Sequence, residues 1–161
     1  MNARPQPRQP PEPTFAGLVD QTLSSDRLQE MSHPEDWPLP APTTELPRST
    51  WDRAVGDIAR DILNRPSRQF RARMCALAWR LGDGAGTVPA ALPFMVEVIH
   101  AGSLIVDDIE DGSTQRRGGP CLHLLHGVPL ALNAGTWMYF WALDLIDQLA
   151  LPAAPREDIR R

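Results

Sequence analysis

The chain has 161 residues, of which 42% are hydrophobic and 22% are charged, and its formal net charge is −4. This length suits one domain of ordinary size, and the acidic balance provides no basic footprint for binding nucleic acid. All sixteen basic residues are arginine, because the chain contains no lysine.

The first fifty residues contain ten of the seventeen prolines and only scattered apolar residues. They show no sustained period of 3.6 or 2, which predicts a largely disordered or loosely attached arm over residues 1–48. One short helix from Asp20 to Met31 is the exception that we expect there. The remaining residues, 49–161, are predicted to form the folded domain.

Four longer helices are predicted in that domain from apolar residues at helical spacing and from Gly and Pro breaks. They run from near Thr50 to Pro66, from Arg68 to Leu81, from Val88 to Asp111 and from about Pro129 to Ala150, with a short helical piece before the last. The third is apolar on nearly every side, so we expect it to be central. The second should bury an apolar side made of Met74, Cys75, Leu77, Ala78 and Leu81. No segment alternates strictly, so the predicted fold class is all-α.

Three carboxylates stand at the acidic end of the third predicted helix. Residues three and four apart share a helix face, so Asp107, Asp108 and Asp111 are expected to converge, while Glu110 points elsewhere. Such a string is also typical of a solvated helix end. Its place next to an apolar run makes unpaired carboxylates costly, and a helix C-terminus does not favour negative charge. We therefore predict a Mg²⁺ site, because Mg²⁺ prefers hard oxygen ligands.

Two arginines follow the acidic string across a short turn. Arg116 and Arg117 lie five and six residues beyond Asp111. Guanidinium groups make bidentate contacts with phosphate, although a pair of exposed loop arginines is the simpler interpretation of these residues alone. Beside a carboxylate face they predict a diphosphate, bridged by metal ions, as the ligand between them.

The sequence resembles the trans-isoprenyl diphosphate synthases, and most of all their geranylgeranyl diphosphate synthase branch. The resemblance covers about Trp51 to the C-terminus and rests on five ordered segments, namely Pro66–Arg71, Ile99–Leu104, Asp107–Asp111, Arg116–Pro120 and His126–Pro129. It implies the N-terminal half of the isoprenoid synthase helical bundle. The implied function is a Mg²⁺-dependent prenyltransferase that condenses an allylic diphosphate with isopentenyl diphosphate.

The resemblance also implies roles for individual residues. Asp107, Asp108 and Asp111 are similar to the first aspartate-rich motif, which holds the Mg²⁺ ions, and Arg116 is similar to the arginine that grips the allylic diphosphate. The pocket for isopentenyl diphosphate is implied at Arg68, Arg71, His100 and Arg117. Relatives carry lysine where this chain has Arg68 and glycine where it has Ser67. His100 on its own is also typical of a core histidine.

The implied reaction is dissociative, because the allylic bond ionises and the cation must be kept from water. Gly102 and Ser103 precede the aspartates by about one helical turn, and their small size is expected to let the product grow past the farnesyl stage to geranylgeranyl diphosphate. The bulky stretch from Trp137 to Trp141 is either a deeper floor of this tunnel or simply core.

A second aspartate-rich motif, present in the C-terminal half of relatives, has no counterpart here. We therefore expect a truncated gene product, a partial sequence or half of a split enzyme, with a homodimer or a complementing chain as its partner. The alternatives are a non-catalytic, diphosphate-binding subunit or remnant that pairs with a full-length synthase, and a fragment of a class I terpene cyclase. The arginines and histidine assigned to isopentenyl diphosphate argue against the cyclase.

The expected location is the cytoplasm. The first seven residues lack the apolar core of a secretory signal, and Cys75 and Cys121 have no metal-ligand spacing, which predicts reduced thiols. The stretch Gly118–Leu143 contains no Asp, Glu or Arg. Its prolines, glycines, histidines and Asn133 interrupt the long apolar run that a spanning helix needs, so we predict buried core there and no transmembrane segment.

Overall fold

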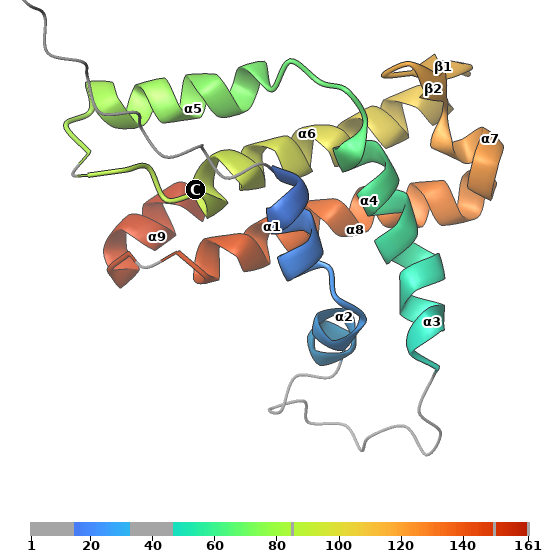
Figure 1. Cartoon of the computed structure of the whole chain (residues 1–161), viewed down its shortest axis with the longest axis horizontal. Helices are drawn as coiled ribbons and strands as arrows, with labels where there is room; N and C mark the ends of the chain where they lie inside the picture. The colour runs from blue at the N-terminus through green and yellow to red at the C-terminus, as the bar shows by residue number, and fades with distance from the viewer. Residues whose placement is uncertain (1–14, 33–46, 85, 150, 161) are drawn as a thin grey trace, which may run out of the picture.

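The computed structural model describes residues 15–32, 47–84, 86–149 and 151–160 (Figure 1). In chain order the helices are α1 (Phe15–Thr22), α2 (Ser25–Ser32), α3 (Arg48–Trp51), the π-helical segment η1 (Asp52–Gly56), α4 (Asp57–Asn64), α5 (Phe70–Leu81), α6 (Ala91–Glu110), α7 (Leu122–His126), α8 (Val128–Asp147) and α9 (Ala153–Arg160). A two-stranded ribbon, β1 (Gln115–Arg116) and β2 (Gly119–Pro120), connects α6 to α7. The predicted all-α class is confirmed.

Helices α6 and α8 lie side by side through the middle of the structure (Figure 1). Their closest approach is between two glycines, since a Cβ atom built on Gly102 would lie 2.7 Å from the carbonyl oxygen of Gly135 and 3.0 Å from the Cβ of Met138. A real Cβ would overlap with these atoms. The absence of a side chain at this crossing therefore allows the two backbones to touch.

The core extends from this crossing along both helices. Phe94, Val98 and Ile105 of α6 and Met138 and Trp141 of α8 are all almost fully buried. The rings of Phe94 and Trp141 meet edge to face, with centroids 5.7 Å apart, an arrangement that aromatic pairs favour. The predicted central position of the third long helix is confirmed. Among the described residues, none of the helices combines the length and the apolar content that crossing a bilayer requires.

The stretch that was expected to be a loose arm differs from that expectation over residues 15–32. It forms two helices where one was predicted, and Val19, Leu23 and Leu28 join the core cluster. The Ser25 hydroxyl also donates a hydrogen bond of 2.6 Å to Asp52. Each helix has only eight residues, which is too few for the spacing of apolar residues to reveal this packing. Residues 1–14 and 33–46 lie outside the described residues, so the arm stays a prediction there.

The first predicted helix of the domain is confirmed, although it begins at Arg48 and includes the π-helical segment. Ile58, Ala59 and Ile62 of α4 are buried as expected. The predicted helix from Arg68 to Leu81 is confirmed as α5, but its apolar side faces outward. Among its large side chains Phe70 is 66% exposed and Leu81 is 77% exposed. Helix α5 packs mainly on α6, through small residues such as Ala72.

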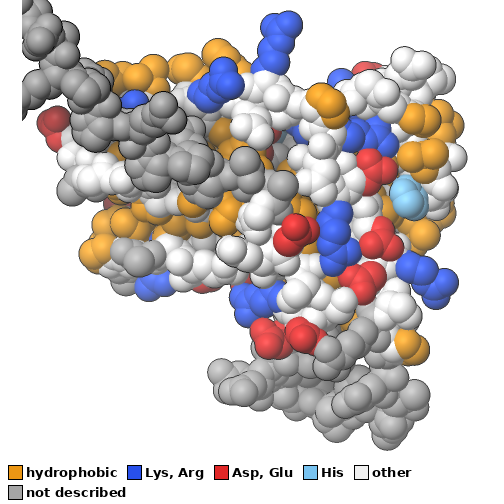
Figure 2. Space-filling view, viewed as in Figure 1, with side chains coloured by type: hydrophobic (Ala, Val, Ile, Leu, Met, Phe, Trp, Pro, Cys, Tyr) orange, Lys and Arg blue, Asp and Glu red, His pale blue; other side chains and the backbone are white. Residues whose placement is uncertain are grey.

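Exposed apolar side chains also continue onto other helices. Figure 2 shows hydrophobic groups spread over the surface near α5 and near α7. The largest exposed apolar residues beyond α5 are Ile99, Leu124, Leu125, Val128, Leu130, Leu132, Phe140 and Leu143. Phe140 is exposed while Trp141 is buried, so the bulky stretch on α8 is divided between the surface and the core.

The ribbon is closed by a tight turn that the sequence analysis did not predict. Arg116 pairs with Gly119, which leaves Arg117 and Gly118 as the two turn residues. Both have positive φ angles, 50° and 79°. Two-residue hairpin turns of this kind normally carry Asn-Gly or Gly-Gly, because L side chains other than those of Asn and Asp rarely adopt positive φ. Arg117 is therefore held in an unfavourable backbone conformation.

The glycine crossing predicts the effect of a single methyl group. We expect Gly102→Ala to lower the free energy of unfolding by about 1–3 kcal/mol, because the added Cβ overpacks the contact with the α8 backbone. Gly17→Ala in α1 is the matched control, since nothing lies within 4 Å of its Cβ position. That control should be neutral or should stabilise by about 0.5–1 kcal/mol, as alanine is the better helix former. Urea unfolding measures both, and equal stability of the two variants would contradict the close approach.

Candidate functional site

The three predicted metal ligands stand in different environments at the end of α6. Asp108 faces inward, with a side chain that is 3% exposed, whereas that of Asp107 is 55% exposed. Asp111 caps the helix, donating its backbone N–H to the Asp107 carbonyl at 2.8 Å, and its side chain is exposed. Asp107 and Asp111, which lie one helical turn apart, are thus exposed, whereas Asp108 is buried.

Arg116 neutralises the buried carboxylate. Its Nε donates to Asp108 Oδ1 at 2.8 Å, and its Nη2 donates to Asp107 Oδ2 at 3.3 Å. The hydrogen bond that Asp108 accepts from Arg116 and the burial of this region set the acid–base properties nearby. Asp108 raises the pKa of Arg116, and burial, together with Asp108, raises the pKa of the Cys121 thiol. Cys75 and Cys121 are both free thiols, as expected.

The three aspartates do not converge as expected. In the part of the chain that the structure describes, no three His, Cys, Asp or Glu side chains lie close enough together to hold a metal ion. Asp108 faces inward instead, where it pairs with Arg116. Asp107 and Asp111 nevertheless fit Mg²⁺ in chemistry and position, because they share a helix side and Mg²⁺ takes one or two carboxylates together with substrate phosphate and water.

A second group of site residues surrounds a buried carboxylate on α6. Glu97 is only 5% exposed, and its Oε2 lies 3.8 Å from Arg117 Nη2. Its Oε1 accepts a hydrogen bond of 3.4 Å from the backbone N–H of Ala72, in the first turn of α5. Arg117 also donates to the carbonyl of Ile62 at 3.0 Å. Glu97 therefore connects the start of α5 with the ribbon that carries Arg116 and Arg117.

His100 lies one turn further along α6, next to this group. Arg71 Nη1 donates to His100 Nε2 at 2.9 Å, which requires a neutral imidazole on that side. Burial lowers the pKa of His100, and the charges of Arg71 and Arg117 lower it further, against the opposing effect of Glu97. Burial also lowers the pKa of Arg117. Arg117 thus pairs with the buried Glu97, while Arg71 contacts a neutral imidazole.

The remaining predicted site residues are less well connected. Arg68 precedes α5, is exposed, and makes no ion pair with the described residues. Ser103 is partly exposed, and its hydroxyl donates to the His100 carbonyl at 2.8 Å. Gly102 faces the backbone of α8, with no room for a Cβ beside it, and the expected role of Gly102 and Ser103 in a product tunnel stays a prediction.

Glu97 was missed by the sequence analysis. It is the only acidic residue between Val88 and Val106, in an otherwise almost entirely apolar run. A lone carboxylate in such a run must find partners when it is buried, and this signal could have identified it.

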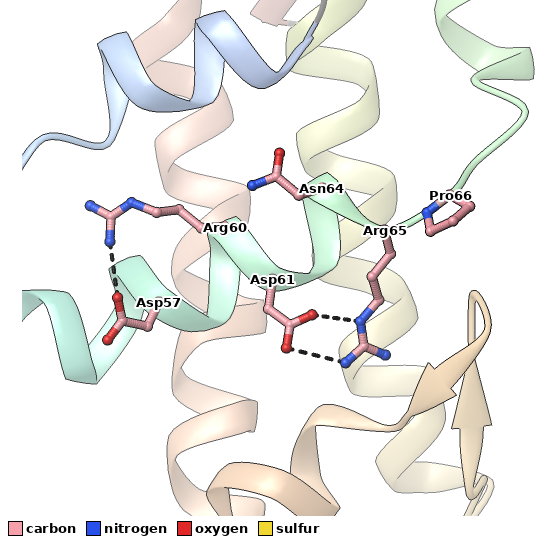
Figure 3. Close-up of a pocket in the computed structure, with 6 residues that line it drawn as sticks. All are labelled: Asp57, Arg60, Asp61, Asn64, Arg65 and Pro66. Carbon is pink, nitrogen blue, oxygen red and sulfur yellow. Dashed lines mark hydrogen bonds and ion pairs between the residues drawn. The ribbon is translucent and has the colours of Figure 1, made fainter.

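A shallow depression lies apart from these two groups, on α4. Asp57, Arg60, Asp61, Asn64, Arg65 and Pro66 line it. Figure 3 shows that its charged side chains pair along the helix, Arg60 with Asp57 and Arg65 with Asp61. Because these charges are already compensated by one another, the depression lacks the unpaired cations of a phosphate site.

Comparison with known proteins gives a family match over residues 52–159, to the model described as polyprenyl synthetase. This range contains both groups of site residues. A geranylgeranyl pyrophosphate synthase of Eremothecium gossypii is 43% identical over 100 residues, which cover 61% of this chain and 31% of that protein.

Two other relatives match over shorter shares. A geranylgeranyl pyrophosphate synthase of Dictyostelium discoideum is 38% identical over 60 residues, covering 37% of this chain and 20% of that protein. A quiannulatene synthase of Emericella variicolor is 42% identical over 96 residues, covering 58% of this chain and 12% of that protein. The matched part of the chain thus spans less than a third of each of these three relatives.

The ion pair of Asp108 and Arg116 predicts that the loss of stability on replacing Arg116 depends on the charge of Asp108. Arg116→Met leaves the buried carboxylate without its main donor, so we expect the free energy of unfolding to fall by about 1–3 kcal/mol. Adding Asp108→Asn should restore part of that loss, because the charge that lacks a partner is removed. A double-mutant cycle by urea unfolding measures the coupling. Additive losses would contradict a direct interaction between the two side chains.

The environment of His100 predicts a titration below its ordinary value of 6.5. The unfolded chain then holds the proton more tightly than the folded chain, so this contribution to stability is present above pH 6.5 and is lost as the pH falls through the lower, folded value. NMR of the imidazole proton measures the midpoint. We expect Glu97→Gln to lower the midpoint further and Arg71→Gln to raise it. A midpoint at or above 6.5 in the parent chain would contradict this description.

Proposed function

The chain belongs to the polyprenyl synthetase family, and on that premise we propose that it is part of a Mg²⁺-dependent prenyltransferase. The proposed reaction joins an allylic diphosphate to isopentenyl diphosphate. Geranylgeranyl diphosphate is the proposed product, because two of the relatives are named for that synthesis. The observation that carries the proposal is the position of two arginine-containing groups next to each other, one beside exposed carboxylates and one around a buried carboxylate.

The first group suits the allylic diphosphate. Asp107 and Asp111 present exposed oxygens from one side of α6, and they are the residues proposed to hold Mg²⁺. When bound, Mg²⁺ draws negative charge onto the leaving diphosphate. Arg116 stands beside them, and its Nη2 already contacts Asp107. To reach a phosphate, Arg116 exchanges part of its contact with Asp107 for the ligand, while its Nε remains on Asp108.

The second group suits isopentenyl diphosphate. Arg68 is exposed and unpaired among the described residues, and Arg71 is exposed apart from its bond to His100. Arg117 supplies further positive charge but is itself held by Glu97 and the Ile62 carbonyl. We propose that Arg68 and Arg71 contact the diphosphate directly, since bidentate guanidinium contacts favour phosphate. His100 and Arg117 then fix the orientation of Arg71 and the local field.

Chain length is proposed to depend on Ser103 and not on Gly102. Ser103 is partly exposed on the side of α6 that carries His100, whereas Gly102 is covered by α8. The apolar wall formed by the neighbouring helices excludes water from a growing chain, which a reactive allylic cation requires.

The proposed location is the cytoplasm, and the proposed partner is a second copy or a complementing chain. A non-catalytic, diphosphate-binding subunit would use only the first group, and a terpene cyclase would not need the second. The Arg71–His100 contact and the buried Glu97 favour the prenyltransferase over both alternatives, because they build a second cationic site that neither alternative requires.

Binding of farnesyl diphosphate tests the carboxylate site. We expect the chain to bind it more tightly with Mg²⁺ than with EDTA, and we expect Asp107→Asn or Asp111→Asn to remove most of the Mg²⁺-dependent gain, because each takes one anionic ligand from the ion. Glu110→Gln is the matched control, an exposed neighbouring carboxylate that is not a proposed ligand. Isothermal titration calorimetry measures each affinity.

Equal loss in the Glu110 variant would show that only local negative charge matters and would overturn the ligand assignment. Absence of Mg²⁺-dependent binding to the parent chain would overturn the proposed substrate site. Release of pyrophosphate on adding isopentenyl diphosphate is the accompanying measurement of condensation by these 161 residues.

A further inference from the structure

The ribbon that carries Arg116 and Arg117 needs an external support. It has only two residues in each strand, and its turn holds Arg117 at a φ of 50°. A backbone conformation of this kind persists only when surrounding contacts impose it. An isolated two-stranded hairpin is also marginal in water. The support must come from the helices beside the ribbon.

Arg65, at the C-terminal end of α4, makes contacts with both strands of the ribbon. Its Nη1 donates to the carbonyl of Arg116 in β1 at 3.0 Å and to the carbonyl of Pro120 in β2 at 2.7 Å. The Arg65 side chain is only 10% exposed. A Cβ on Gly119 would come within 3.2 Å of the same Nη1, so the glycine at that position allows this close approach.

The opposite side of the guanidinium is fixed by Asp61, one turn earlier on α4. Arg65 Nε donates to Asp61 Oδ1 at 2.6 Å, and Nη2 donates to Oδ2 at 3.2 Å. Figure 3 shows this two-pronged contact, with Arg65 pointing from α4 towards the ribbon. Arg65 thus uses one planar group to join a carboxylate on its own helix to two carbonyls of the ribbon. A lysine ammonium, which is a single point of charge, cannot reproduce this geometry.

We propose that Arg65 is a positioning residue that directs Arg116 and Arg117 towards their ligands. This inference rests on the proposed function. Arg65 acts through the backbone of Arg116, whose side chain binds Asp107 and Asp108. It also holds both strands on either side of the turn in which Arg117 has a positive φ. The Arg117 side chain completes the support by donating to Ile62, on the same helix as Arg65. The end of α4 therefore sets the direction of Arg116, which is proposed to contact phosphate, and of Arg117, which is proposed to orient Arg71.

Arg65→Lys tests this role, with Arg60→Lys as the matched control. Arg60 lies on the same helix and is also ion-paired, with Asp52 at 3.0 Å and Asp57 at 3.1 Å, but it makes no contact with the ribbon. Two readouts are needed. The first is the NMR signal and hydrogen-exchange rate of the Arg116 Nε–H group, which is bonded to Asp108. The second is the Mg²⁺-dependent affinity for farnesyl diphosphate.

We expect Arg65→Lys to shift the Arg116 signal, to speed its exchange and to weaken Mg²⁺-dependent binding about 10- to 100-fold, the usual effect of losing a partner that orients a ligand. Arg60→Lys should lower thermal stability without moving either readout. Asp61→Asn, which loosens Arg65 but leaves it in place, should change both readouts in the same direction and by less. This second variant also provides the test if Arg65→Lys does not fold.

An unchanged Arg116 signal in a folded Arg65 or Asp61 variant would overturn the proposal, as would an unchanged affinity. An equal shift of the Arg116 signal in Arg60→Lys would overturn it too, because the effect would then follow from general loss of stability. The NMR readout does not depend on any substrate. A parent chain that fails to bind farnesyl diphosphate therefore overturns the proposed function, while the signal of Arg116 still decides whether Arg65 positions it.

Discussion

The direct backbone contact between α6 and α8 at Gly102 and Gly135 determines the rest of the arrangement. It leaves α6 no freedom to rotate about its axis, because any turn would push a side chain into the α8 backbone. Residues at helical spacing from the crossing, such as Ile105 and Asp108, consequently face inward, and His100, Asp107 and Asp111 share another side. A packing constraint in the core thus decides which of three neighbouring aspartates is available to a metal ion.

The buried carboxylates of the described residues follow a second rule, which is that each has an arginine partner from the same ribbon. Arg116 pairs with Asp108, and the next residue, Arg117, pairs with Glu97. Glu97 lies eleven residues, or about 16 Å, before Asp108 on α6. A buried carboxylate without such a partner would be costly. The ribbon therefore stabilises the fold and presents cations for phosphate at once. At Arg116 and Arg117, ligand binding has to redistribute hydrogen bonds that already exist. Arg68, unpaired among the described residues, and Arg71, which is exposed and bonded to His100, can contact a ligand at lower cost.

Much of this arrangement could be predicted from the sequence. Helical spacing and breakers located α4, α5, α6 and α8 to within a few residues, and the order of the motifs indicated the family. Three features could not be predicted, for physical reasons. The outward direction of the apolar side of α5 depends on which helix it meets, and the packing of α1 and α2 depends on contacts far apart in sequence. The inward direction of Asp108 depends on how α6 packs on α8. In the sequence, Asp61 and Arg65 have the i,i+4 spacing that is typical of a surface ion pair, and spacing alone does not reveal that the Arg65 side chain is only 10% exposed. Whether the assigned site residues act as proposed is decided by the binding experiments.

The strained turn at Arg117 also has a consequence for the engineering and the evolution of this protein. Asparagine or glycine at this position would suit the positive φ and would relax the backbone, so a selection for thermal stability alone should favour them. Either replacement would also remove a guanidinium group and leave Glu97 with a poorer partner. Replacing Arg117 is therefore expected to raise stability and to lower activity. Variants selected for stability without a ligand-binding screen are expected to carry substitutions at this position that weaken the site.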